Sequence, residues 1–153
     1  MKHLVAVSEH CAGCKQCEMV CSFHHSGRFS PSFSRITVLK NDRYGLDYPI
    51  VCRQCDRCPP LENCPVKAMS RMNGIIKVDL ELCIGCEKCV DLCKFGAVKV
   101  SEGKAIICDL CHGEPECVKR CPTHALNYIE TESNQEMPGE AFNEQKKRWG
   151  MIE

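Results

Sequence analysis

Sixteen cysteines in a chain of 153 residues are the side chains whose type and spacing could do chemistry. They fall into four groups of four, and no cysteine is left over. Soft thiolates gathered this closely select zinc, copper(I) or iron–sulfur centres. The groups are Cys11, Cys14, Cys17 and Cys21; Cys52, Cys55, Cys58 and Cys64; Cys83, Cys86, Cys89 and Cys93; and Cys108, Cys111, Cys117 and Cys121.

Three uses of these cysteines compete: disulfide bonds, zinc and iron–sulfur clusters. Dense disulfides are typical of exported proteins. The segment after Met1 has no long apolar core, no small-residue cleavage site and no twin arginine, and the chain has no Asn-x-Ser/Thr site. We therefore expect a cytoplasmic protein whose cysteines are metal ligands.

The spacing of the cysteines favours iron–sulfur clusters over zinc, which usually takes its ligands as two separated pairs. Three close thiolates suit three corners of a cubane, and a fourth cysteine one helical turn later suits a different cubane. This spacing resembles that of bacterial two-cluster ferredoxins, in which the fourth cysteine of one run ligates the other cluster. We expect four [4Fe–4S] clusters and no separate metal site, with a zinc-binding interaction module as the alternative.

The middle of the chain indicates how the groups pair. Asn73-Gly74 predicts a tight turn, Ile75 to Val78 predict a strand, and the stretch resembles the interior of one two-cluster ferredoxin. The resemblance implies that the second and third groups share two clusters, which leaves the first and fourth groups for each other. A tandem pairing of groups one with two and three with four is the rival. The nested ligand sets are site 1 (Cys11, Cys14, Cys17, Cys121), site 2 (Cys108, Cys111, Cys117, Cys21), site 3 (Cys52, Cys55, Cys58, Cys93) and site 4 (Cys83, Cys86, Cys89, Cys64).

The expected fold class is α+β, with two nested two-cluster ferredoxin-like units built from short β-hairpins and short helices. The outer unit is residues 1–51 and 94–130, with a hairpin insert at 22–51, and the inner unit is residues 52–93. Strands are expected at 4–7, 35–39, 46–51 and 75–78, a turn followed by a strand at 103–107, and a helical turn at 66–69.

Residues 131–153 form a C-terminal tail in which Ala141 to Trp149 predict a short helix ended by Gly150. Phe142 and Trp149 are seven residues apart and would lie on one face of this helix. That face could pack on the rest of the chain or dock on a partner, and the sequence favours neither.

The composition excludes several other classes of protein. Twenty basic and twenty acidic residues give a net charge of zero, whereas nucleic-acid binding asks for a basic stripe. No apolar run approaches the roughly 20 residues of a membrane span. Four oxidised clusters with their thiolates would bring the charge to about −8, so a partner surface should be basic or mixed.

Two departures from the usual ferredoxin spacing stand out. Cys58 lies six residues before Cys64, so Pro59 to Asn63 should form a local bulge. Cys93 is followed by Lys94 where proline is usual, and this lysine either raises a cluster potential or is simply exposed. His10 and His112 adjoin cysteines and are candidates for hydrogen bonds to cluster sulfur.

Taken together, the four groups resemble the four-cluster iron–sulfur subunits of large anaerobic oxidoreductases, over roughly residues 3–130. Residues 17–36 and 108–126 are similar to the small electron-transfer subunit of tungsten-containing aldehyde oxidoreductases and tungsten benzoyl-CoA reductases. The resemblance implies an electron-transfer subunit without catalytic residues, and the chain has no glycine-rich nucleotide fingerprint.

The resemblance also implies partners. One is a large catalytic subunit of the tungsten–pterin type, and another is a ferredoxin, a flavoprotein or a further copy of this chain. Alternatives within the same class are the iron–sulfur subunit of a hydrogenase, formate dehydrogenase or carbon monoxide dehydrogenase complex, and a free-standing polyferredoxin.

Overall fold

The computed structural model describes residues 1–132 and 137–151. Within these ranges the strands form antiparallel pairs: β1 with β8, β2 with β3, β4 with β5 and β6 with β7. This mixture of short strands and short helices confirms the α+β class. The strands are β1 (Lys2–Ala6), β2 (Thr37–Asn41), β3 (Leu46–Ile50), β4 (Met69–Met72), β5 (Ile75–Val78), β6 (Lys99–Ser101), β7 (Lys104–Ile106) and β8 (Leu126–Glu130).

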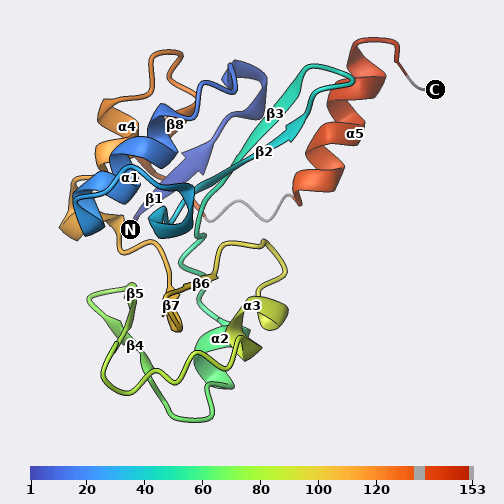
Figure 1. The fold of residues 1–153 in the computed structure, drawn as a ribbon. Coiled ribbons are helices and arrows are strands. Elements are labelled where there is room, and N and C mark those ends of the chain that lie inside the picture. Colours follow the sequence, from blue (N-terminus) through green and yellow to red (C-terminus); the bar gives the residue numbers. More distant parts are fainter. Residues whose placement is uncertain (133–136, 152–153) are drawn as a thin grey trace.

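The β1–β8 pair joins the segment before the first cysteine group to the segment after the fourth. Lys2 lies opposite Glu130 and Ala6 lies opposite Leu126. Leu4, Ala6 and Leu126 are buried, so one face of this pair closes an apolar core. The topology therefore brings the first and last cysteine groups to the same end of the molecule, beside α1 and α4 (Figure 1).

The remaining strand pairs are hairpins whose turns agree with the sequence patterns. Asn73 and Gly74 have φ of 51° and 79°, the left-handed values that an Asn-Gly turn supplies. The predicted helical turn at 66–69 is wrong, because Lys67 has φ of 52° and Met69 already pairs with Val78 in the β4–β5 hairpin. The predicted strand at 35–39 begins two residues later, at Thr37.

The α-helices are α1 (Gln16–Ser26), α2 (Pro59–Glu62), α3 (Lys88–Leu92), α4 (Glu116–Lys119) and α5 (Pro138–Arg148). The 3₁₀ turns are η1 (Ser8–His10), η2 (Pro31–Phe33) and η3 (Leu110–Gly113). Helix α1 ends at Gly27, whose N–H donates to the carbonyl of Phe23 over 2.8 Å. The bulge predicted between Cys58 and Cys64 is the single-turn helix α2. None of the helices in the described ranges has the length and apolar character needed to cross a bilayer.

Cysteines form part of both main apolar cores. One core consists of buried residues of β1 and β8, together with Ile36 and Val38, which pack with Cys17, Cys21 and Cys117. The other gathers Met69, Ile76 and residues 95–98 around Cys52 and Cys58. Figure 1 shows these parts at opposite ends, with α2, α3, β4 and β5 away from α1 and α4.

Helix α5 packs on the rest of the chain. Ala141 and Phe142 bury themselves against β3, where the Phe142 ring meets the Tyr48 ring edge-on at 6.2 Å. Gln145 Nε2 donates to Ser8 Oγ over 2.6 Å. The helix begins three residues earlier than predicted because Pro138 suits a first helical position. Residues 133–136 and 152–153 of the predicted tail lie outside the described residues.

Candidate metal centres

Three cavities are each lined by four cysteines, and in each cavity three cysteines of one group meet the last cysteine of another. The cavity of site 3 has a volume of about 200 Å³. The lining sets are Cys64, Cys83, Cys86 and Cys89; Cys52, Cys55, Cys58 and Cys93; and Cys21, Cys108, Cys111 and Cys117.

The site 1 cysteines are close enough to influence one another's ionisation. Burial raises the pKa of Cys11, and the charges of Cys14 and Cys121 add to this rise. Burial also raises the pKa of Cys17 to about 12, with contributions from Cys11 and Cys14. Because the charge of Cys121 acts on Cys11, Cys121 lies near the first cysteine group.

Helices distribute ligands between neighbouring sites. Cys17 and Cys21 lie one turn apart on α1, and Cys21 lines the site 2 cavity whereas Cys17 lies close to Cys11. Cys89 lies on α3 and Cys93 caps its C-terminus, and they line the cavities of sites 4 and 3 respectively. One helical turn therefore separates candidate ligands of two adjacent candidate sites.

A tight turn shapes site 4. Gly85, between Cys83 and Cys86, has φ of +67°, and a Cβ built on it would lie 2.7 Å from the carbonyl carbon of Gly103. Only glycine combines this backbone conformation with so close an approach of another chain segment. The turn thus ties the third cysteine group to the loop between β6 and β7.

Backbone N–H groups point at cysteine sulfurs. The N–H groups of Arg35, Ala68 and Ala105 each lie 3.3 Å from the Sγ of Cys21, Cys64 and Cys83 respectively. Hydrogen bonds to sulfur are one of the means by which a protein sets the potential of an iron–sulfur cluster. Four sulfur donors per cavity together with such N–H groups fit a [4Fe–4S] cluster.

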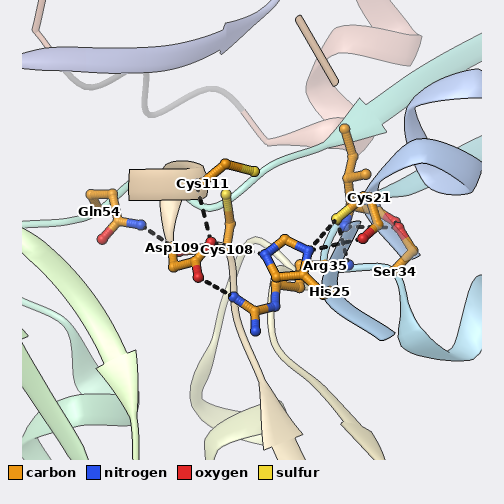
Figure 2. A network of polar contacts seen from close by, with 9 residues as sticks. Cys21, His25, Ser34, Arg35, Gln54, Cys108, Asp109 and Cys111 are labelled. Atoms are coloured by element: carbon orange, nitrogen blue, oxygen red, sulfur yellow. Dashed lines mark hydrogen bonds and ion pairs between the residues drawn. The ribbon is translucent and has the colours of Figure 1, made fainter. Parts of the chain in front are cut away.

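A network of charged side chains borders Cys21 in site 2 (Figure 2). Asp109 accepts hydrogen bonds from His25 Nε2 over 3.1 Å and from the Cys111 N–H over 3.1 Å, and it pairs with Arg35 over 2.6 Å. His25 Nδ1 lies 2.8 Å from the Cys21 carbonyl oxygen and 3.7 Å from its Sγ. The network links α1, the segment before β2 and the fourth cysteine group.

Ionisation follows this geometry. Burial disfavours the charged form of His25, but hydrogen bonds to Asp109 and Cys21 outweigh it and raise the pKa of His25 to about 9. Burial likewise opposes ionisation of Asp109, yet His25 and Arg35 hold its pKa well below its usual value. Hydrogen bonds from His25 and Arg35 also lower the pKa of Cys21 against the effect of burial. The cationic form of His25 donates from both ring nitrogens.

His25 is a residue that the sequence analysis missed. Within the described residues, the hydrogen bond from a histidine ring to a cysteine sulfur comes from His25, not from the candidates His10 and His112. The sequence contained the signal, because His25 follows Cys21 by four residues and therefore lies one helical turn further along α1.

Gln54 connects sites 2 and 3. Its side chain is buried and bridges two segments: Nε2 donates to the Cys108 carbonyl over 2.7 Å, and Oε1 accepts from the Ile76 N–H over 2.8 Å. Burial raises the pKa of Cys52, and the charge of nearby Cys108 adds to the rise. A candidate ligand of site 3 and a candidate ligand of site 2 are therefore neighbours.

Comparison with known proteins identifies the family. Models of a 4Fe-4S binding domain match residues 8–24 and 76–99, which contain the first and third cysteine groups. The chain is 38% identical over 148 residues to YsaA of Escherichia coli, covering 88% of this chain and 93% of that protein, whose name refers to electron transport. It is 37% identical over 122 residues to the polyferredoxin-like subunit of the aliphatic sulfonate oxidoreductase of Pyrococcus furiosus, covering 77% of this chain and 70% of that subunit.

A solved structure has a similar fold. A chain of the active-site complex BamBC of benzoyl coenzyme A reductase with bound benzoyl-CoA aligns with a TM-score of 0.52 and 25% identity, over 97% of this chain and 91% of that chain. Together with the extensive identity to curated relatives, these matches show that the chain belongs to the ferredoxin-type, 4Fe-4S-binding electron-transport proteins.

Proposed function

We propose that the chain is a non-catalytic electron-transfer subunit that holds four [4Fe–4S] clusters, one in each of sites 1 to 4. The observation that carries this proposal is that three cavities are each lined by four cysteines drawn from two groups. Clusters of this type exchange one electron at a time.

Contacts between the ligand sets support a linear order from site 1 through sites 2 and 3 to site 4. Sites 1 and 2 share helix α1 through Cys17 and Cys21. Sites 2 and 3 meet where Cys52 lies near Cys108. Sites 3 and 4 share α3 and its cap through Cys89 and Cys93. The role of the chain is to hold neighbouring sites at fixed separations and to exclude water from their buried sides.

The partner is proposed to be a large catalytic subunit of the tungsten-containing aldehyde oxidoreductase type. This follows from the resemblance of residues 17–36 and 108–126 to the small subunits of such enzymes. It is supported by the likeness to a chain of the benzoyl coenzyme A reductase active-site complex and to an oxidoreductase subunit. A ferredoxin or flavoprotein would exchange electrons at the other end.

The test is anaerobic purification of the full chain followed by metal and sulfide analysis. About sixteen irons and sixteen sulfides per chain are expected, with EPR signals after reduction by dithionite. Protein carrying stoichiometric zinc and no sulfide would refute the proposal. Co-purification with a tungsten subunit from the native source tests the partner, and recovery of the chain alone would contradict it.

Serine variants test the ligand sets. Nested pairing predicts that Cys121→Ser and Cys14→Ser alter the same EPR signal, because both cysteines belong to site 1. Tandem pairing predicts instead that Cys121→Ser shares its signal with Cys86→Ser. The matched comparison of these single-atom substitutions separates the two arrangements without relying on activity.

A further inference from the structure

We propose that the exposed groove on α1, lined by Met19, Phe23, Phe29 and Arg120, is the docking surface for an acidic electron carrier of the ferredoxin type. This inference rests on the proposed function and deepens it, because it names the surface through which electrons pass between a carrier and sites 1 and 2. The occupant follows from three properties of the groove: its aromatic surface, its charges and its small extent.

Aromatic and thioether side chains are exposed to solvent on one face of α1. Met19 and Phe23 are 51% and 50% exposed, and Phe29, which follows the helix, is 66% exposed. The rings of Phe23 and Phe29 stack with their centroids 4.6 Å apart. With Val20 they line a groove of about 510 Å³. Exposed apolar side chains gathered in this way are typical of a binding surface, and aromatic residues and methionine are enriched in protein interfaces.

The groove lies on the other side of α1 from candidate ligands of two sites. Cys17 and Cys21 are buried on α1, whereas Met19 and Phe23 are exposed on it. An α-helix is about 10 Å in diameter, so only this thickness would separate a docked carrier from sites 1 and 2. Helices α1 and α4 lie at the opposite end of the molecule from β4 and β5 (Figure 1). The groove therefore belongs to the end of the proposed order that begins with site 1.

Two exposed cations border the groove without an ion pair among the described residues. Arg120 lines it. Lys15 lies one helical turn before Met19, whose N–H donates to the Lys15 carbonyl over 3.1 Å, so the two residues share one side of the helix. A third cation, Arg28, pairs with Glu102 over 3.3 Å. Lys15 and Arg120 are therefore the cations that carboxylates of a partner would meet.

Acidic side chains near the groove are engaged by other groups. Glu114 and Glu116 pair with Lys119 over 3.0 and 2.7 Å. The hydrogen bond from Lys119 lowers the pKa of Glu116, and Arg120 adds to this effect at longer range. Glu18 is buried and accepts a backbone N–H over 2.6 Å. Among the described residues, the border of the groove thus presents unpaired cations to a partner, while its carboxylates are paired or buried.

The opposite end of the proposed order has the reverse charge. Leu80, Leu82 and Ile84 are also exposed there, by 54%, 51% and 64%, but residues 79–88 contain three acidic side chains and one lysine. An acidic carrier would be repelled by this loop and attracted to the cations of the groove. The two apolar surfaces therefore favour different partners.

The extent of the groove favours a transient partner over a permanent subunit. Six described residues line it, whereas a standard interface takes about 20–30 residues from each side and obligate interfaces bury roughly 2,000 Å² or more. Weak electron-transfer encounters bury less than about 1,200 Å². A ferredoxin fits these properties, because its thiolate-ligated clusters add negative charge and it leaves after delivering or accepting an electron.

The experiment measures electron transfer from a reduced bacterial two-cluster [4Fe–4S] ferredoxin, used as the probe, to the anaerobically purified full chain by stopped-flow absorbance. The variant Phe29→Ser removes the most exposed ring of the groove. The double variant Lys15→Gln/Arg120→Gln removes its two unpaired cations. Each rate is measured over a range of ionic strength, because screening by salt separates the effect of charge from the effect of apolar contact.

Matched controls change exposed residues elsewhere. Leu80→Ser removes an apolar side chain that is 54% exposed, and Lys88→Gln/Lys147→Gln removes two exposed cations, all outside the groove. A second reductant, photoreduced deazaflavin, is small and uncharged and needs no docking surface. It is included because Lys15 and Arg120 lie close to cysteines in the sequence, so their loss could act on the clusters themselves.

Phe29→Ser and the double variant of the groove should each lower the second-order rate constant for the ferredoxin roughly threefold to tenfold. The double variant should also weaken its dependence on ionic strength, and the deazaflavin rates should not change. The inference is overturned if the controls slow the ferredoxin equally, if the groove variants leave it unchanged, or if deazaflavin is slowed to the same extent.

Two other occupants of the groove would also overturn the inference. Loss of a co-purifying catalytic subunit in Phe29→Ser would assign the groove to that subunit, and loss of self-association, followed by sedimentation, would assign it to a second copy of this chain. Failure of the proposed function looks different, because the native chain would then accept electrons from neither reductant.

Discussion

Replacing Gln54 with Met would break the bridge between sites 2 and 3. The Gln54 side chain is 2% exposed and makes two hydrogen bonds, one to the Cys108 carbonyl and one from the Ile76 N–H. Methionine has a similar length and no amide, so the substitution removes both bonds with little change in volume. Ile76 is fully buried, so water cannot easily replace the lost partner at its N–H.

The expected loss of stability comes from two buried groups that lose their hydrogen-bond partner, the Cys108 carbonyl and the Ile76 N–H. A buried donor or acceptor left without a partner costs about 1–3 kcal/mol, so the two together destabilise the local structure by about 2–6 kcal/mol. Even the lower value raises the opening equilibrium of this segment roughly thirtyfold. Hydrogen–deuterium exchange of the peptide containing Ile76 measures this opening directly in the native protein.

Gln145→Met is the matched control. Gln145 is also a buried glutamine, but its amide donates to a single partner, the partly exposed Ser8 hydroxyl. That hydroxyl can rotate toward water, so we expect a cost of about 1 kcal/mol and unchanged exchange at Ile76. If Ile76 is as well protected in Gln54→Met as in the control, Gln54 does not couple the segments of sites 2 and 3 and the reasoning fails.

Further substitutions test the other local interpretations. Gly85→Ala should destabilise site 4 by about 2 kcal/mol or more, which is measured as loss of iron on heating. The control is Gly103→Ala, because Gly103 has a similar positive φ but no atom within contact distance of an added Cβ. An equal effect of the two substitutions would show that contact with the Gly103 backbone is not the cause. Asp109→Asn should lower stability by about 2–3 kcal/mol, because it leaves Arg35 and His25 partly buried without their anion; an unchanged melting temperature would contradict this. Because the pKa of His25 is raised from 6.5 to about 9, its stabilising contribution is complete below about pH 6.5 and is lost as the pH rises through 9. His25→Gln should therefore flatten the dependence of melting temperature on pH in that range. Removing iron with a chelator should unfold the chain as followed by circular dichroism, and a native-like spectrum of the iron-free chain would contradict it.

Local patterns in the sequence predicted local structure well. The Asn73-Gly74 turn and the strand at Ile75 to Val78 required only turn chemistry and alternation, and both are present. The helical turn at 66–69 failed because its residues suit a helix, yet pairing of Met69 with β5 decides their conformation.

Features made by distant residues could not be predicted in the same way. Arg53 and Phe95 are 42 positions apart in the sequence, and only the fold brings the Arg53 guanidinium to the Phe95 ring. In the triad of His25, Arg35 and Asp109, His25 and Asp109 lie next to cysteine groups in the sequence, whereas Arg35 follows Cys21 by 14 residues. Their convergence depends on the β1–β8 pairing that joins the chain ends, which no local pattern specifies.

Burial of the cysteines couples metal binding to folding. The apolar cores contain Cys17, Cys21, Cys117, Cys52 and Cys58 as members, so the same side chains that would hold iron also complete the cores. Burial raises the pKa of Cys17 and Cys108 to about 12, so without metal these thiols stay neutral at physiological pH. Iron binds thiolates and releases their protons, which means that the positive metal core must supply the electrostatic stabilisation that the cavity itself lacks.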